Sequence, residues 1–256
     1  MSTGGPGSVV PNASDGHTGA DAAFYRRHYA GGVETGAMAP EVFEREMLMP
    51  GKRYSLMMEN LTRENTSGRI IAEVGCGGAE ALKIISERYN FAHHIGVDIA
   101  ASAGSADKWR ASRIEIINAN LNERWPFTDG QIDCLAAMMV IEHLFDPFQA
   151  FQEITRCVAK DGAAYVNLPL VTGIRNRMRL LFGNVPITST RYASWFSDRE
   201  WDGNHLHYFS IQSVTDLARA CGLRVTGIRG VGRFHGLKSR IPALLASEAT
   251  FRLEHL

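Results

Sequence analysis

Apolar and polar positions between residues 69 and 168 predict strands and helices in regular alternation. Short apolar runs typical of buried strands occupy 70–74, 94–98, 113–117, 133–138 and 163–168, the last preceded by a turn at Asp161-Gly162. Apolar residues at helical spacing predict helices at 79–89, 102–111 and 147–158, the last capped by Asp146 with Pro147 in its first turn. Buried strands that alternate with helices form parallel sheets covered on both faces. The pattern therefore predicts an α/β fold with a doubly wound, mostly parallel sheet.

The segment before this alternation is organised differently. Residues 1–20 are rich in Gly, Ser, Pro and Asn, and we predict that they form a disordered tail. Residues 21–66 carry helical patterns, one of them with Tyr29 in an aromatic stripe, and we assign them to an N-terminal helical cap. The stripe fits core packing, and the alternative is a lid that closes over a ligand.

The alternation breaks after the fifth strand. The segment of residues 169–207 is longer than an ordinary connection between a strand and a helix. Its length predicts a lid or a small subdomain over a binding site. The pattern resumes with a helix at 211–220 and a strand at 223–229. We expect a helix at 241–249, whereas no clear final strand is visible. We assign 67–256 to one domain that contains the insertion.

A glycine-rich turn follows the first apolar run, and a carboxylate ends the second. Glu73, Gly75 and Gly77 stand at the end of the first strand, and Asp98 ends the next one. In a parallel α/β sheet, these two strand ends hold a nucleoside. The glycines can adopt positive φ and let the backbone approach a ligand, and Asp98 is placed to accept hydrogen bonds from both ribose hydroxyls.

The residue types at this turn select among nucleoside cofactors. A dinucleotide motif requires a third glycine where this chain has Glu80, whose charge would repel a phosphate. Glu73 instead favours a ligand that carries an amino group. S-adenosylmethionine has a ribose, an ammonium group and no phosphate, so we predict it as the cofactor and S-adenosyl-L-homocysteine as the product. The alternatives are a purely structural strand-to-helix turn and an NAD-dependent oxidoreductase.

Composition and charge argue against several classes of function. Lys+Arg and Asp+Glu both number 27, so no net charge attracts nucleic acid or an anionic membrane. The four cysteines show neither a C-x-x-C pair nor zinc spacing, which is typical of buried thiols in a reducing compartment. No apolar run approaches the roughly 18 residues of a membrane span, and the first residues lack signal-peptide order. We predict a cytoplasmic protein with no nucleic-acid partner and no membrane partner.

Over roughly residues 67–230, the chain resembles class I S-adenosylmethionine-dependent methyltransferases. The resemblance is carried in order by Glu73-Val-Gly-Cys-Gly77, Asp98, Asn118 to Phe127 with Asp129 to Asp133, Met139 to Pro147, and Val158 to Gly162. It implies a Rossmann-like fold and methyl transfer from S-adenosylmethionine. We place five further residues beside that cofactor: Cys76, Ile99, Asn120, Leu121 and Met138.

Two positions depart from the pattern of this family. Asn120 stands where many members carry an aspartate for the adenine amino group, and an uncharged amide makes that contact weaker. Met139 stands where ubiquinone-pathway O-methyltransferases carry an acidic residue beside a Glu-His pair implicated in metal binding. Glu142 and His143 alone are a poor divalent site, so we predict no metal. His143 remains a catalytic candidate, and the alternative is a residue that packs and orients its loop.

A pair of histidines near the end of the insertion is the strongest candidate for acceptor chemistry. His205 and His207 alternate, so in an extended chain both side chains would face the same way. Imidazole titrates near working pH, and our hypothesis is that one of them, with His205 preferred, acts as the general base or binds the acceptor hydroxyl. The alternative is that they fasten the insertion to the edge of the sheet.

Other side chains of the insertion and the cap are candidates for acceptor binding. Arg175 and Arg179 would share one face of a helix and could bind a phosphate or carboxylate, although a solvated helix face is the preferred explanation. Tyr29, Tyr192, Trp195 and Tyr208 are the aromatic candidates, and for the aromatic residues of the insertion burial beneath the lid is the alternative.

The segment from Asn204 to Ser210 resembles one found in a methyltransferase subgroup that acts on glycans and small metabolites. This resemblance implies a methyltransferase that modifies a hydroxyl, or less favourably an amine, of a small molecule or glycan. The main alternative is a non-catalytic protein that binds S-adenosylmethionine and regulates a partner. A nucleic-acid methyltransferase would carry an Asn/Asp-Pro-Pro-Tyr/Phe signature where this chain has Met138-Met-Val-Ile141. We also keep a homodimer among the partner predictions.

Overall fold

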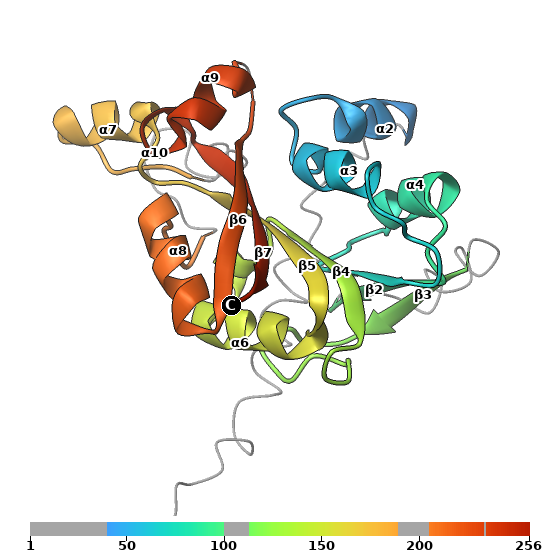
Figure 1. The fold of residues 1–256 in the computed structure, drawn as a ribbon. Helices are drawn as coiled ribbons and strands as arrows, with labels where there is room; N and C mark the ends of the chain where they lie inside the picture. Colours follow the sequence, from blue (N-terminus) through green and yellow to red (C-terminus); the bar gives the residue numbers. More distant parts are fainter. Residues whose placement is uncertain (1–39, 100–112, 189–204, 233) are drawn as a thin grey trace, which may run out of the picture.

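The computed structural model describes residues 40–99, 113–188, 205–232 and 234–256 (Figure 1). Several sequence predictions lie outside these residues: the tail at 1–20, the helix at 102–111, and the acceptor candidates Tyr29, Tyr192 and Trp195. None of the described helices combines the length and the apolar character needed to cross a bilayer.

The seven-stranded sheet follows the order β3-β2-β1-β4-β5-β7-β6. Its strands are β1 (Ile70–Val74), β2 (His93–Asp98), β3 (Ile114–Asn118), β4 (Ile132–Met138), β5 (Val158–Pro169), β6 (Leu223–Gly230) and β7 (Glu248–His255). The first five strands are parallel, and β7 runs antiparallel to both β5 and β6. The strand order reverses between β1 and β4, and ligands of open α/β sheets bind at the carboxyl ends of the strands at such a point.

Helices cover both faces of the sheet (Figure 1). They are α2 (Pro40–Leu48), α3 (Ser55–Leu61), α4 (Glu80–Arg88), the 3₁₀ helix η2 (Ile141–His143), α6 (Pro147–Cys157), α7 (Ile174–Leu181), α8 (Ile211–Ala220), α9 (His235–Arg240) and α10 (Pro242–Leu245). Side chains of α6 and α8 share one buried cluster with the sheet, and those of α3 and α4 share the other. The layers confirm the predicted fold class. The Asp146 side chain caps α6 by accepting from the backbone N–H groups of Phe148 and Gln149, as predicted.

The end of the chain differs from the sequence prediction. In place of a helix at 241–249, α10 ends at Leu245 and β7 begins at Glu248. Within β7, Phe251, Leu253 and His255 are buried while Arg252 and Glu254 are half-buried, which is the period-two pattern of a strand. That signal was present in the sequence, so the missing final strand was a wrong reading of a short apolar stretch.

The fifth strand is also longer than predicted. It begins at Val158, and the expected turn at Asp161-Gly162 lies within it. Ile132 is opposite Val158 and Cys134 is opposite Ala163, so the intervening residues of β5 form an irregularity against Asp133. The sheet therefore absorbs the Asp-Gly pair as a bulge, a device that commonly uses glycine.

The part of the helical cap that the structure describes, residues 40–66, is bound to the two antiparallel strands. Arg229 of β6 donates two hydrogen bonds to Glu59 of α3, at 2.8 and 2.6 Å. The Thr250 hydroxyl of β7 donates to the carbonyl of Arg53, and Arg53 pairs with Glu248 at 2.7 Å. Residues at the start of α3 are thereby held beside the carboxyl end of the central strands.

Candidate active site

The turn after β1 contains two glycines in the left-handed region. Gly75 has a φ of 69° and Gly77 a φ of 54°, which confirms the predicted conformations. A Cβ at Gly75 would lie 2.7 Å from the Cγ2 of Val140, so glycine lets the segment after β4 approach the turn. Nothing lies within 4 Å of a Cβ at Gly77, so on that side the backbone is open to a ligand.

The end of β2 is bonded directly to this turn. The N–H groups of Gly75 and Cys76 donate to the carbonyl of Val97, at 2.7 and 3.2 Å. The N–H of Gly77 donates to Oδ2 of Asp98 at 2.8 Å. These bonds place the Asp98 carboxylate beside the open face of Gly77, where the sequence analysis expected a ribose.

Glu73 supplies a buried carboxylate behind the turn. Its side chain is only 3% exposed, and the Tyr54 hydroxyl donates to Oε1. Oε2 is buried and has no hydrogen-bond partner among the described residues. Burial raises the pKa of Glu73 to about 7, although the Tyr54 hydrogen bond lowers it. Because a buried carboxylate is costly without a donor or cation, this orphaned oxygen fits the ammonium group of the predicted cofactor.

Tyr54 is a site residue that the sequence analysis missed. It immediately precedes α3, and its apolar neighbours suggested core packing rather than a role beside β1. Burial and the adjacent Glu73 carboxylate raise the pKa of its hydroxyl. The hydroxyl therefore acts as a permanent hydrogen-bond donor that connects the cap to the turn.

The remaining predicted cofactor residues make mainly local contacts. Cys76 is buried and its Sγ lies beside Gly96, where a Cβ would come within 2.7 Å. The carbonyl of Ile99 accepts from the Asn118 amide at 3.1 Å. Leu121 is 7% exposed and belongs to the core, while Met138 is half-buried at the end of β4.

Asn120 forms a tight local turn. Its Oδ1 accepts from both the backbone N–H and the side-chain amide of Asn122, each at 3.1 Å. A carbonyl oxygen has two lone pairs, and these two bonds occupy them. The predicted contact with an adenine amino group would therefore require the Asn122 side chain to move.

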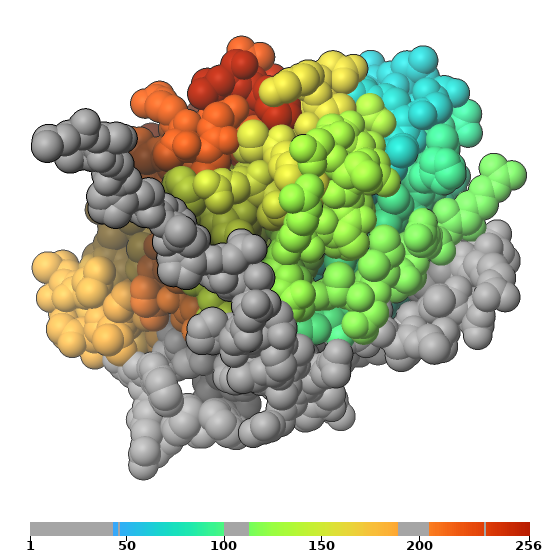
Figure 2. All heavy atoms as spheres, turned by 90° about the horizontal axis from the view of Figure 1, so that it is seen from below, coloured from blue at the N-terminus to red at the C-terminus, as the bar shows by residue number. Residues whose placement is uncertain are grey.

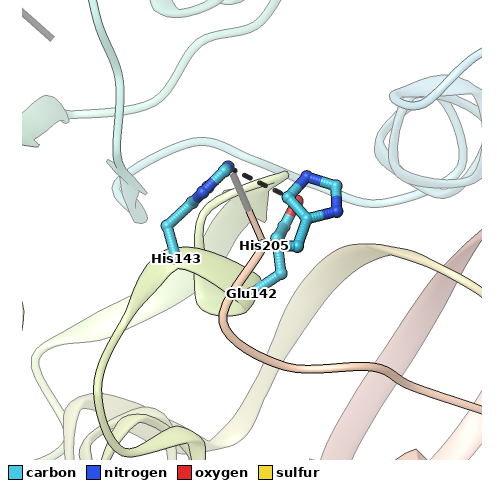
Figure 3. A group of neighbouring side chains, drawn as sticks. All are labelled: Glu142, His143 and His205. Atoms are coloured by element: carbon cyan, nitrogen blue, oxygen red, sulfur yellow. Dashed lines mark ion pairs between the residues drawn. The ribbon is translucent and has the colours of Figure 1, made fainter. Parts of the chain in front are cut away.

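The segment after β4 builds a second cluster of polar side chains beside the glycine turn. Met139 has a φ of 58°, an uncommon conformation for a residue with a Cβ, and η2 follows it with Glu142 and His143. His205 reaches the same place from the far end of the insertion (Figure 3). The rings of His143 and His205 lie edge to face with centroids 4.9 Å apart, and Nε2 of His143 is 3.9 Å from Oε1 of Glu142.

Glu142 is the most deeply buried member of this cluster. Its side chain has no exposed surface, and neither carboxylate oxygen has a hydrogen-bond partner among the described residues. Burial raises the pKa of Glu142 to about 8, while the positive charge of Arg53 opposes that rise. A proton on Glu142 is therefore exchangeable near neutral pH, next to two imidazoles.

Backbone and side-chain bonds hold His205 and separate its role from that of His207. The N–H of Leu206 donates to the carbonyl of Glu142 at 2.9 Å, and Oγ1 of Thr188 lies 2.6 Å from Nδ1 of His205. Nε2 of His207 instead lies 3.2 Å from the carbonyl of Phe145. His205 thus joins the polar cluster, whereas His207 fastens the insertion to the segment after β4.

The cluster also has the composition of a cation site with three ligands. One atom from each of Glu142, His143 and His205 lies within 4.8 Å of the others. Two imidazoles and one carboxylate are a donor set that transition-metal ions accept. The sequence analysis counted only Glu142 and His143, because nothing in the local pattern brings His205 to them. The prediction of no metal therefore rested on an incomplete set of donors.

Of the predicted acceptor residues, the structure describes Arg175 and Arg179, which both lie on α7, and Tyr208 near the end of the insertion. Arg175 is exposed on α7, and Nε of Arg179 donates to the carbonyl of Val185 at 2.8 Å. Tyr208 is 48% exposed, three residues beyond His205. The sequence analysis missed Thr188, which follows the loop after α7 and contacts His205.

Comparisons with known proteins agree with this architecture. Residues 72–166 match the family model described as a methyltransferase domain. A protein of Mycolicibacterium smegmatis named "Probable S-adenosylmethionine-dependent methyltransferase" is 26% identical over 188 residues, which cover 72% of this chain and 62% of the relative. A relative of the same description from Mycobacterium tuberculosis is 29% identical over 121 residues, covering 46% and 42%. The chain thus spans less than two thirds of the length of either relative.

Solved structures share the fold at low sequence identity. A phosphoethanolamine N-methyltransferase of Haemonchus contortus, solved with S-adenosyl-L-methionine, has a TM-score of 0.60 at 13% identity and covers 92% of this chain and 60% of that one. A 1,6-didemethyltoxoflavin-N1-methyltransferase of Burkholderia thailandensis has a TM-score of 0.55 at 11% identity, covering 92% and 87%. The domain match and the relatives support the predicted class of S-adenosylmethionine-dependent methyltransferase and its predicted cofactor.

Proposed function

We propose that this protein transfers the methyl group of S-adenosylmethionine to a hydroxyl of a small molecule or sugar, with His205 as the general base. The observation that carries the proposal is the cluster of Glu142, His143 and His205, which lies just after β4 beside the turn of Gly75. We include residues 169–207 as the lid over the acceptor, since the end of this insertion leads directly into His205.

The chain's own residues would hold the cofactor from three sides. Glu73 would accept from its amino group with the orphaned Oε2, Asp98 would accept from the ribose, and Gly77 would allow close approach of the backbone. When bound, S-adenosylmethionine supplies an activated sulfonium methyl group. The protein then has to align an acceptor and remove its proton.

The cluster provides the groups needed for proton removal. If Nδ1 of His205 carries the hydrogen that is shared with Oγ1 of Thr188, then Nε2 is the basic nitrogen. The imidazolium formed after proton transfer would lie close to Glu142, and its positive charge would favour ionisation of that carboxyl, which in turn would stabilise the imidazolium. His143 packs edge to face against His205 and restricts its orientation.

A buried base favours a hydroxyl over an amine acceptor. A neutral amine attacks the methyl group with its lone pair and needs no prior deprotonation, whereas a hydroxyl becomes a strong nucleophile only as it loses its proton. The solved relatives named above are N-methyltransferases by name, so an amine acceptor remains the second candidate. A non-catalytic regulatory role would leave the buried Glu142–His205 arrangement without a purpose.

The test is formation of S-adenosylhomocysteine by the purified full chain with matched acceptor pairs. Each pair differs only in a hydroxyl or an amine at the same carbon, across monosaccharides and small aromatic compounds. We expect turnover with at least one hydroxyl member and a rate that rises with pH as the base loses its proton. Turnover confined to amine members would overturn the hydroxyl assignment. Cofactor binding without turnover on any member would favour the regulatory alternative.

A further inference from the structure

Helix α7 and the helical turns before β7 carry exposed apolar side chains. Figure 1 shows where these helices lie in the fold. More than half of the exposed large apolar side chains of the described residues fall within 174–185 and 234–244. They are Ile174, Met178, Leu180, Leu181, Phe182, Val185, Phe234, Leu237, Ile241 and Leu244. We refer to these two segments together as the α7–α10 surface. Contiguous exposed apolar groups on a folded protein usually mark an interaction site.

Helix α7 has an inverted orientation. Ile174, Met178 and Leu181 form a stripe at four- and three-residue spacing, yet they are 44%, 44% and 72% exposed. The one buried residue of the helix is Asn176 on the opposite face, where its Oδ1 accepts from the N–H of Ile187 at 3.0 Å. An amphipathic helix normally turns its apolar stripe to the core. Here the buried side chain of the helix is polar, and the apolar stripe is exposed.

The charges on this surface are all of one sign. Residues 170–188 and 231–247 contain no Asp or Glu, although the chain as a whole has no net charge. Arg175 and Arg179 flank the apolar stripe on one side, and Arg177 flanks it on the other. Arg177 also donates to the carbonyl of Ala243 at 3.3 Å, which joins α7 to α10. Lys238 and Arg240 of α9 add further positive charge.

We propose that the α7–α10 surface docks the protein peripherally on an anionic lipid bilayer. An apolar stripe with Arg on both flanks suits the boundary between acyl chains and headgroups, because the Arg stems extend along the apolar layer while their guanidinium groups contact phosphates. Acidic headgroups attract each cation by an amount that salt reduces. A second copy of the chain is disfavoured as occupant, because two surfaces without a carboxylate would repel each other.

Two short contacts link the α7–α10 surface to the polar cluster of Glu142, His143 and His205. Asn176 accepts from the N–H of Ile187, and the next residue, Thr188, contacts His205. Figure 2 shows the light-orange atoms of α7 at the rim of the molecule. The sequence analysis predicted no membrane partner from the balanced net charge and from the lack of a membrane-span-length apolar run, and neither criterion detects a local excess of cations on one surface. The proposal stands independently of the proposed function, since it concerns binding and not turnover.

Vesicle flotation with the full chain tests the proposal. The probes are vesicles of phosphatidylcholine and of phosphatidylcholine mixed with phosphatidylglycerol. We expect binding to the anionic vesicles that is at least about tenfold stronger than to the neutral ones and that weakens as salt rises. Equal binding to both vesicle types, or no binding to either, would overturn it.

Two leucines of the same exposure provide a matched pair of variants. Leu181 and Leu256 are each 72% exposed, and Leu256 lies outside the α7–α10 surface. We expect Leu181→Asp to weaken binding to anionic vesicles about tenfold or more, while Leu256→Asp binds like the wild type. Arg175→Glu should weaken the same binding about tenfold without affecting neutral vesicles. Unchanged binding of both Leu181→Asp and Arg175→Glu would contradict the proposal.

Sedimentation velocity on the same proteins distinguishes the competing occupant. We expect the wild type and Leu181→Asp to have the same oligomeric state in the absence of lipid. A wild-type dimer that Leu181→Asp dissociates, together with no preference for anionic vesicles, would assign the surface to a second copy instead. Circular dichroism of each variant shows whether it has kept its fold, so that loss of vesicle binding can be separated from misfolding. If Leu181→Asp misfolds, the vesicle binding of Arg175→Glu tests the proposal.

Discussion

The proposed cofactor side and the proposed acceptor side of this site are built in different ways. The cofactor side is local: β1, its turn and the end of β2 supply Glu73, Gly77 and Asp98, joined by backbone hydrogen bonds. The acceptor side is assembled from the segment after β4 and from His205, which lies far from that segment in the sequence. The geometry of a site built from backbone hydrogen bonds is fixed once the sheet forms. The geometry of the acceptor side also depends on how the insertion packs against the segment after β4. The two sides should therefore respond to mutation independently.

The largest expected effect breaks the acceptor side alone. His205→Ala should lower kcat about 100- to 10,000-fold, because it removes the proposed base, while the dissociation constant of S-adenosylmethionine stays unchanged. Rates of S-adenosylhomocysteine formation and calorimetry measure the two quantities. His207→Ala is the matched control, and it should lose thermal stability but retain most of kcat because Nε2 of His207 bonds to the carbonyl of Phe145 and not to the polar cluster. Normal turnover by a folded His205→Ala protein would rule out the base.

Glu142 should make the free energy of unfolding depend on pH. Its folded pKa of about 8 lies above the ordinary 4.5, so the folded state keeps a proton that the unfolded state releases. The stability from this group is fully present below pH 4.5 and is lost as pH rises through 8. At pH 7 the loss already amounts to about 3 kcal/mol.

Urea unfolding at several pH values, with a chelator present, measures this effect. Glu142→Gln should flatten the loss of stability between pH 5 and pH 8, leaving the smaller part that comes from Glu73, whose pKa is about 7. An unchanged slope in the Gln variant would mean that Glu142 is ionised in the folded protein. A chelator that lowers the stability of the wild type but not of Glu142→Gln would instead indicate a bound metal ion.

The cofactor side should break separately at Asp98. Asp98→Ala should lose ribose hydrogen bonds worth about 1.5–3 kcal/mol, which is roughly ten- to hundredfold in affinity. Calorimetric titration with S-adenosylhomocysteine measures this loss, and kcat at saturating cofactor should change far less than in His205→Ala. Affinity equal to that of the wild type would remove Asp98 from the site.

The smallest expected effect tests the link between the cap and the cofactor side. Tyr54→Phe removes the hydroxyl that donates to Glu73, and since that bond lowers the pKa of Glu73, the pKa should rise further above about 7. A protonated Glu73 attracts an ammonium group less, so cofactor affinity at neutral pH should fall about fivefold. The loss should shrink as pH increases, and a loss that is constant with pH would contradict this reason.

The same contrast explains what could be predicted from the sequence. The Glu73 to Asp98 region was predictable because strand, turn and carboxylate follow one another and need only the next strand for their geometry. The contact between Glu142 and His205 was not, since it depends on the path of a long insertion. Alternation placed His205 and His207 on one face, but only the docked structure shows that they bond to different residues. Likewise, spacing predicted the face shared by Arg175 and Arg179 and could not indicate which side of α7 meets solvent.

The antiparallel pairing of β5 with β7 has a consequence for how this protein folds during its synthesis. On the ribosome, the chain emerges from its N-terminus, so β1 to β5 are available before β6 and β7 are synthesised. Until residues 248–255 leave the exit tunnel, β5 has an unpaired edge and the carbonyl of Arg53, just before α3, lacks the Thr250 hydroxyl that donates to it. The turn after β1 and Asp98 can thus reach their final arrangement early, whereas the residues before α3 are fixed only once β7 has paired. During this interval the unpaired edge of β5 would need protection from aggregation.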